Sequence, residues 1–301
     1  MKRTLLLFVF MMSTILMAQE GPVTLRYPDG TLKEVANYAK GRYNGEVRKY
    51  YPTGILASVA NYKTGTLEGS AFNYDSTGIL KEAFNYSGNK LQGRFATFHP
   101  DGKLREEGIY KDGAFSGDYT SYHPSGKIKS KSFFISGKIE GVSYEYWENG
   151  NLKGELLFKN GVQEGVTKWY YETGELHGEY PYLGSKIHGL VKEYYPSGKK
   201  KAEKKYTGSK AEGVHVTWFE NGTVQSEITY KNSLKEGPAK TWYESGKPWT
   251  DQMWVNNRLH GESKIYRESG TLWSVDLYEK GTIKSSKEYD EKGNLISEKS
   301  Y

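Results

Sequence analysis

A glycine recurs at a fixed spacing along almost the whole chain. Ten consecutive intervals between members of this series are 24 residues long, and the last is 23. The members are Gly30, Gly54, Gly78, Gly102, Gly126, Gly150, Gly174, Gly198, Gly222, Gly246, Gly270 and Gly293. A second glycine series keeps the same interval from Gly45 to Gly261. Two locked series of this length indicate tandem repeats, each of which packs mainly against its neighbours.

Large side chains keep the same period. When residues are counted from the first glycine of each repeat as position 0, an aromatic residue stands at +8 in every repeat, from Tyr38 to Tyr301. Another stands four residues before each following glycine, from Tyr50 to Tyr289, which is position +20 of a 24-residue repeat. Position +2 is usually Leu. Aromatic residues favour strands and glycines favour turns, so each repeat is predicted to be a β-hairpin.

The predicted fold is all-β: about twelve 24-residue hairpins over residues 19–301, forming one continuous, elongated twisted sheet or solenoid. Side chains alternate between the faces of a strand, so a regular register would place positions +2, +4, +8 and +20 on one apolar face. Ser233, Asn257 and Ser285 replace glycines of the repeat. We expect altered turns in those repeats.

Two segments resemble the core of the MORN motif, an aromatic residue followed by glycines at the fourth and eighth places: 110–117 and 158–165. His188-Gly189 and His260-Gly261 resemble the frequent His-Gly step of that motif. The resemblance extends over about residues 23–301 and is to the bacterial MORN variant. It implies a repeat scaffold. It also implies two further roles: an antitoxin component of a toxin–antitoxin system, or a membrane-associated protein as proposed for eukaryotic relatives.

The first eighteen residues have the layout of a secretory signal peptide. Lys2 and Arg3 precede an apolar run over 5–16, and Ala18 supplies a small residue for cleavage before Gln19. We therefore expect residues 1–18 to be removed and the chain to be exported to the periplasm, the outer surface or the medium. A retained N-terminal anchor is the alternative. The chain has no Cys, which excludes disulfides and thiolate metal sites.

Charge and motifs argue against catalysis and against nucleic-acid binding. The formal charge is +6, but acidic residues are interspersed with the basic ones, so there is no continuous basic stripe. The six histidines lack the local spacing of metal ligands, and neither a nucleophile elbow nor a phosphate-binding glycine loop is present. We expect no catalytic residue, no metal and no cofactor. A hydrolase acting on envelope polymers is the weakest of the alternatives.

The function predicted from the sequence is a non-catalytic, secreted repeat scaffold for protein–protein interaction. Membrane-surface association and an antitoxin-like role are the alternatives, and the oligomeric state stays open. The partner is expected to be another protein, with weak membrane-surface contact as a further option. Four tryptophans stand outside the two aromatic series and are the candidate partner-binding residues: Trp147, Trp169, Trp249 and Trp273.

Overall fold

The computed structural model describes residues 19–301, in two units of residues 19–114 and 115–301. The predicted signal peptide and its cleavage site at Ala18 lie outside or at the border of the described residues. Each unit is described by itself below. In the part of the chain that the structure describes, no helix is long and apolar enough to cross a membrane.

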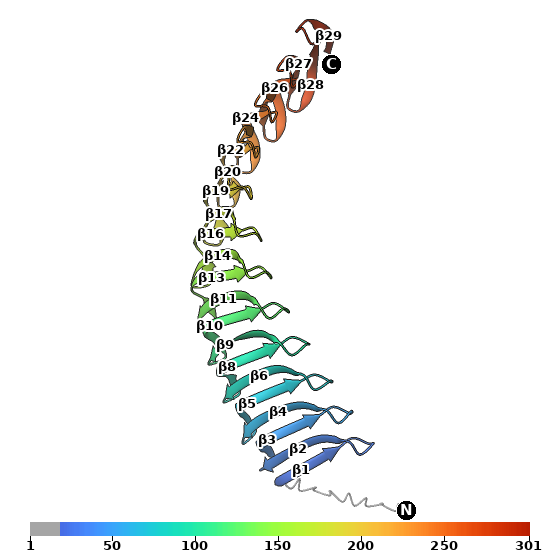
Figure 1. Cartoon of the computed structure of the whole chain (residues 1–301), viewed down its shortest axis with the longest axis vertical. Coiled ribbons are helices and arrows are strands. Elements are labelled where there is room, and N and C mark those ends of the chain that lie inside the picture. The colour runs from blue at the N-terminus through green and yellow to red at the C-terminus, as the bar shows by residue number, and fades with distance from the viewer. Residues whose placement is uncertain (1–18) are drawn as a thin grey trace, which may run out of the picture. The chain divides into compact units, whose positions relative to one another are not determined.

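The first unit is a sheet of antiparallel strands that follow one another in chain order (Figure 1). Two-residue strands such as β7 share one side of a hairpin with the strand that follows them. The strands are β1 (Gly21–Arg26), β2 (Leu32–Ala39), β3 (Arg42–Tyr50), β4 (Leu56–Lys63), β5 (Thr66–Tyr74), β6 (Leu80–Ser87), β7 (Lys90–Leu91), β8 (Gly93–Phe98) and β9 (Leu104–Lys111).

The second unit repeats the same hairpin, again with antiparallel neighbours in chain order. This confirms the predicted all-β architecture of tandem hairpins. The strands are β10 (Ala114–Tyr122), β11 (Ile128–Ile135), β12 (Lys138–Ile139), β13 (Gly141–Tyr146), β14 (Leu152–Lys159), β15 (Val162–Gln163), β16 (Gly165–Tyr170), β17 (Leu176–Leu183), β18 (Lys186–Ile187), β19 (Gly189–Tyr194), β20 (Lys200–Thr207), β21 (Lys210–Ala211), β22 (Gly213–Trp218), β23 (Val224–Lys231), β24 (Leu234–Trp242), β25 (Pro248–Val255), β26 (Arg258–Tyr266), β27 (Leu272–Glu279), β28 (Thr282–Tyr289) and β29 (Leu295–Ser300).

Both ends of the hairpin need positive φ angles. The first-series glycine closes a turn: Gly54 has φ 83° and donates its N–H to the Tyr51 carbonyl at 2.8 Å. At the opposite end, two consecutive residues have positive φ, as in the two-residue turns whose twist matches that of a hairpin. The prediction of altered turns is wrong for Ser233 and Asn257, which keep φ of 68° and 61°. Polar residues tolerate this conformation when the hairpin enforces it.

The prediction of one apolar face at the even positions is also wrong, because two β-bulges interrupt the register of each repeat. Pairing shifts between Lys49 and Tyr50, which leaves position +3 as the extra residue of the partner strand. It shifts again around the second-series glycine, where Gly45 has φ 108°. A bulge changes the face to which the following side chains point. Positions +2 and +20 therefore lie on the face opposite to +4 and +8.

We call the face that holds the buried side chains the inner face. The buried residues of both units fall at five positions of the repeat, +4, +6, +13, +17 and +19. Position +17 is the most regular of them, with Val47 and Val191 each 2% exposed. Aromatic residues at +8 flank this row; in the first unit the ring of Tyr43 lies 4.9 Å from Tyr38 and 5.1 Å from Tyr62. A thin row of small and aromatic side chains is thus the core of each sheet.

In several repeats, a side-chain acceptor at position +14 links the hairpin to the next one. Glu140 accepts the backbone N–H of Asn160 at 2.6 Å, and Glu236 accepts that of Asn256 at 2.7 Å. The same bond is made by Glu68, Gln92 and Glu212. The turn N–H groups are thereby satisfied by the preceding repeat, which fixes the spacing between neighbours.

Candidate binding surfaces

Trp147 belongs to a row at position +21 that the sequence does not reveal as a series. Its indole Nε1 donates to the Tyr170 carbonyl of the next repeat at 3.2 Å. Tyrosines at the same position do this with their hydroxyls; Tyr171 donates to the Tyr194 carbonyl at 2.8 Å. Since any donor of the right length serves, the row contains Tyr, His, Trp and Arg. Half-buried Trp147 therefore joins neighbouring repeats. Its predicted partner-binding role stays a prediction.

Trp169 lies at position +19 of the inner face and covers Gly154 of the paired strand. A Cβ added at Gly154 would meet the Trp169 ring at 2.6 Å, so the glycine makes room for the indole. The two residues form a matched packing pair. Trp169 is half-buried in this arrangement.

Trp249 and Trp273 are the exposed members of the predicted set, 47% and 50% accessible. Both occupy position +3, the bulge residue, in consecutive repeats. The ring of Trp249 lies 5.7 Å from that of Tyr243, and the Arg267 guanidinium lies 5.9 Å from the Trp273 ring centre. The structure thus separates Trp147 and Trp169, which are engaged within the sheet, from these two open rings.

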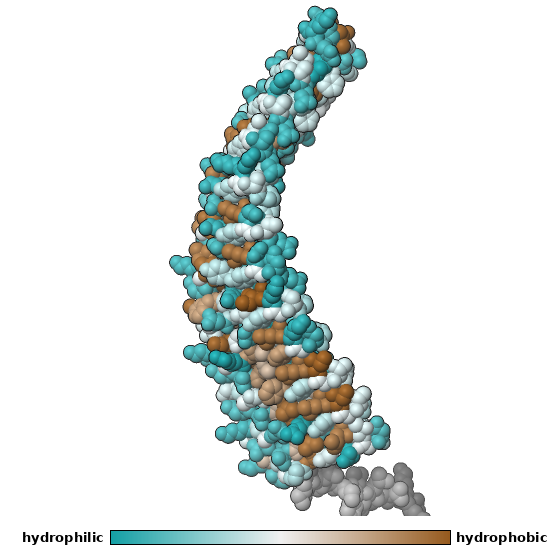
Figure 2. All heavy atoms as spheres, viewed as in Figure 1, coloured by the Kyte–Doolittle hydropathy of each residue, from teal (hydrophilic) through white to brown (hydrophobic). Residues whose placement is uncertain are grey.

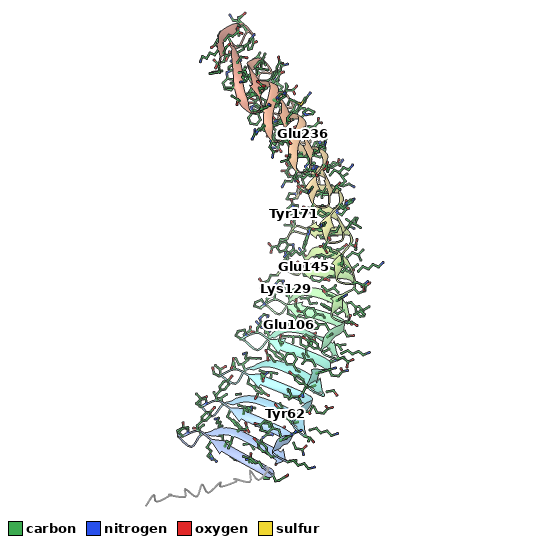
Figure 3. All side chains as sticks on the ribbon, turned by 180° about the vertical axis from the view of Figure 1, so that it is seen from behind. Tyr62, Glu106, Lys129, Glu145, Tyr171 and Glu236 are labelled. Carbon is green, nitrogen blue, oxygen red and sulfur yellow. The ribbon has the colours of Figure 1, made fainter. Side chains whose placement is uncertain are left out.

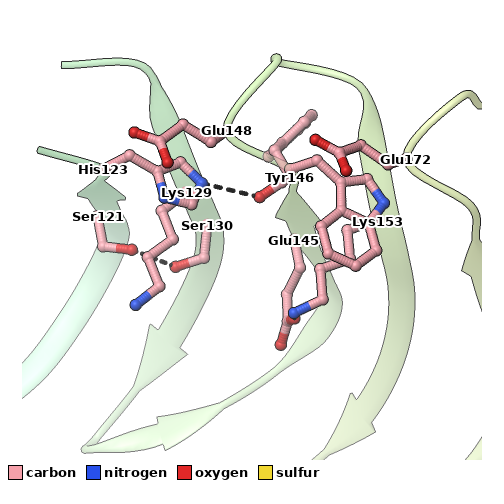
Figure 4. Close-up of a pocket in the computed structure, with 10 residues that line it drawn as sticks. Ser121, His123, Lys129, Ser130, Glu145, Tyr146, Glu148, Lys153 and Glu172 are labelled. Atoms are coloured by element: carbon pink, nitrogen blue, oxygen red, sulfur yellow. Dashed lines mark hydrogen bonds and ion pairs between the residues drawn. The ribbon is translucent and has the colours of Figure 1, made fainter. Parts of the chain in front are cut away.

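A cavity of about 550 Å³ lies over strands β11 and β13 and the turns beyond them (Figure 4). His123 shares a hydrogen bond of 3.0 Å with the Tyr146 carbonyl, and Lys153 pairs with Glu145 at 3.4 Å. Lys129 and Glu145 also lie on successive hairpins in the view from behind (Figure 3). The remaining lining residues include Ser121, Ser130, Trp147, Glu148 and Glu172. Mixed charge and existing hydrogen bonds make this a polar hollow.

The opposite, outer face of strands β11–β19 carries an apolar row. Its members occupy positions +7 and +16, and pairs such as Val142–Leu157 and Val166–Pro181 lie directly across from each other. The exposed side chains among them are 39–50% accessible. In Figure 2, separate apolar side chains are seen among polar ones at the level of strands β13–β19. The row consists of Phe133, Val142, Leu157, Val166, Pro181 and Leu190.

Charges of alternating sign run beside the apolar row at positions +5 and +18. Each member pairs across strands with a residue of opposite charge, and Lys192 lies 3.7 Å from Glu179. This charged row consists of Glu155, Lys168, Glu179, Lys192 and Glu203. On the same face, the Tyr170 hydroxyl donates to Glu155 at 3.2 Å. Burial, and then the nearby Glu155 carboxylate, raises the pKa of Tyr170.

One titratable group is buried in the core row. His215 is 8% exposed at position +17, between the rings of Tyr206 and Tyr230, and its Nε2 bonds the Lys205 carbonyl at 2.9 Å. Burial lowers the pKa of His215; the carbonyl opposes this and the Lys204 cation adds to it. Within residues 19–301, no group of three or more His, Asp or Glu is placed to hold a metal ion.

Comparison with known proteins places these features in a family context. The family model described as a MORN repeat variant matches eight segments, 43–64, 91–112, 116–136, 139–160, 163–183, 187–207, 211–232 and 235–256. Together they cover more than half of the chain. A search of curated proteins finds no match.

Two solved structures are similar over 93% of this chain. They are the crystal structure of TcdB2-TccC3-TEV, at 14% identity, and that of TcdB2-TccC3 without its hypervariable C-terminal region, at 12%. The TM-score is 0.18 for both. The chain spans 19% and 17% of the length of those proteins.

Proposed function

The chain belongs to the MORN repeat variant family, and we propose that it is an exported, non-catalytic scaffold that binds another protein through the outer face of strands β11–β19. The observation that carries this proposal is the exposed apolar row of that face. Single exposed apolar residues are ordinary, but a contiguous row marks an interaction surface.

The fold itself does not need apolar side chains at these positions. In the first three repeats, the equivalent residues at +7 are Asn37, Asn61 and Asn85. Asn61 donates to the Ser70 carbonyl at 3.1 Å and Asn85 to the Arg94 carbonyl at 2.8 Å. The same hairpin therefore folds with a polar pair in place of Leu157 and Val166. Their apolar character is better explained by a partner than by the stability of the repeat.

The charged row favours a polypeptide as the occupant. Its alternating Lys and Glu side chains give no net attraction for an anionic lipid surface or a nucleic acid, both of which select basic patches. A protein surface can present both signs in the complementary order and so fix the register of docking. The apolar row supplies the contact area, and the charged row supplies the specificity.

The absence of an enzymatic role is part of this proposal. Some of the side chains that could serve catalysis are used within the repeat: carboxylates at +14 accept turn N–H groups, and His123 bonds a carbonyl. Because these groups already hold hydrogen bonds within and between repeats, they support a structural role.

The test is affinity capture from detergent-solubilised envelope extract with the chain from residue 19 onward, read by mass spectrometry. The variant Leu157→Asn with Val166→Ser imports the polar pair of the first unit. The matched control, Asn61→Leu with Ser70→Val, makes the reverse change there. We expect a protein captured in near-stoichiometric amount by wild type and control to be lost with the first variant. Equal capture by both variants refutes the proposed surface, and capture of anionic vesicles instead favours membrane association.

A further inference from the structure

Two tryptophans form a second surface, distinct from the outer face. Trp249 on β25 and Trp273 on β27 occupy the bulge position +3 of consecutive repeats and are 47% and 50% exposed. Side chains at +3 point to the inner face: Arg105 donates to the Thr97 hydroxyl at 3.2 Å, and Thr97 belongs to the buried row. The two indoles therefore open on the side opposite to the proposed protein-binding rows.

The neighbouring residue at position +21 supports each indole. The ring of Tyr243 packs against Trp249, with centroids 5.7 Å apart and planes tilted by 36°, and its hydroxyl donates to the Tyr266 carbonyl at 2.9 Å. Arg267 lies over Trp273 at 5.9 Å and donates to the Tyr289 carbonyl at 2.6 Å. A side chain that is hydrogen-bonded to the next repeat thus backs each ring. Rings held in this way lose little conformational entropy when a ligand stacks on them.

The repeat sets the distance between the two rings. Equivalent positions on β25 and β27 are separated by one intervening strand, β26, and each step between strands is about 4.8 Å. The spacing is therefore about 9.6 Å, from two such steps. A ligand that lies across the strands must present two flat apolar faces at this interval to engage both rings.

We propose that Trp249 and Trp273 form a stacking platform for an extended β-1,4-linked glycan. In such a chain the ring substituents are equatorial, so each sugar presents a flat face of C–H groups, and these are attracted to the negative face of an indole. Successive sugars are turned by half a turn. Every second sugar presents the same face, and one disaccharide has close to the length of the two-strand step.

Polar groups beside the rings suit the hydroxyls of a sugar. The hydroxyls of Thr241 and Thr250, next to Trp249 on the inner face, lie 2.6 Å apart. One of the two donates to the other, so the second O–H is left to donate to a ligand. The charged group in contact with the two rings is Arg267, whose Nη1 and Nη2 atoms already donate to three backbone carbonyls. This favours an uncharged polymer over a polyanion.

The repeat does not demand tryptophan at this position. Lys153 and Lys201 occupy +3 in other repeats and stack over the +21 rings of Trp147 and Tyr195 through their ammonium groups. The platform is therefore a local departure within a regular array. This provides a matched control, because Lys201→Ala removes a +3 side chain outside the platform.

The test is isothermal titration of the chain from residue 19 onward with three soluble hexasaccharides: chitohexaose, cellohexaose and the α-linked maltohexaose. We expect at least one β-linked hexamer to bind, maltohexaose not to bind, and the responding β-linked sugar to distinguish an N-acetylglucosamine polymer from a glucose polymer. Trp249→Ala and Trp273→Ala should each weaken binding about tenfold, the equivalent of one stacked pair. Trp249→Phe should retain part of the affinity, and Lys201→Ala all of it.

Three results overturn the platform: no binding of either β-linked hexamer, equal binding of maltohexaose, or unchanged affinity in tryptophan variants that keep the wild-type circular dichroism spectrum. The variant Leu157→Asn with Val166→Ser separates this proposal from the protein-binding one. It lies on the other face, so it should bind the hexasaccharide like wild type even where it loses its protein partner.

Discussion

Gly189 tests whether the second-series glycine is needed for its backbone conformation. Its φ is 121°, well beyond the left-handed well that L residues enter, and an added Cβ would meet the rigid ring of Pro181 at 3.0 Å. Strained backbone of this kind costs about 1–3 kcal/mol. The contact with Pro181 adds to it, so Gly189→Ala should lower the free energy of unfolding by about 2–4 kcal/mol.

Gly198→Ala is the matched control, because Gly198 has φ 79° and nothing within 4 Å of an added Cβ. Its cost should be only about 1–2 kcal/mol, that of a left-handed residue alone. Urea unfolding followed by far-UV circular dichroism measures both. The reasoning is refuted if Gly189→Ala is no more destabilising than Gly198→Ala.

The repeat that contains Ser285 supplies a second arm of this test. There the bulge has lost one residue, and Leu277 pairs with Ser285 while Tyr278 pairs with Ile283. No positive φ is needed at Ser285. Deletion of Gly189 should recreate this shorter bulge, so it should cost less stability than Gly189→Ala. A deletion that is the more damaging change would show that the long bulge is required in the middle of the array.

Two further predictions concern pH and processing. Burial lowers the pKa of His215 below its ordinary value near 6.5, so the unfolded chain binds the proton more readily and stability should fall as pH drops from about 6.5 through the lower folded value. The variant His215→Val places at +17 the residue that Val191 provides in the preceding repeat, so it should remove this fall in stability at acid pH. Urea unfolding at a series of pH values measures the effect, and an unchanged pH dependence in the variant would contradict the prediction. N-terminal sequencing of the exported chain should begin at Gln19, and a retained Met1 would contradict cleavage.

The sequence predicts the hairpins well because their turns need glycine. Gly54 and its equivalents occupy a conformation that few other residues adopt, so the spacing of glycines records the spacing of turns. The sequence does not show in the same way to which face of the sheet each side chain points. A glycine such as Gly45 looks the same in a turn and in a bulge, and only the pairing of β3 with β2 shows which it is.

The rows at +14 and +21 that link neighbouring repeats cannot be found from residue types in the sequence, for a different reason. Position +21 holds a donor of similar reach in several repeats, and Tyr171, Trp147 and Arg267 all supply one. Chemically unlike residues that do the same work leave no visible consensus. A search for side-chain donors at +21 and acceptors at +14, in place of residue types, is the signal that would find both rows.

The fold constrains some positions of the repeat and leaves others variable, and the variable positions are where binding residues can be placed. The inner row at +17 must stay buried, as Val191 and Ala239 show, and side chains at +14 and +21 link several of the repeats. Position +7 holds Asn85 in one repeat and Leu157 in another, and +3 holds Lys201 or Trp249, without a change of hairpin. Residues at +3 and +7 are therefore free to be selected for binding. Runs of one chemical type at these positions, confined to neighbouring repeats, are the places where partners should be sought in other chains of this architecture.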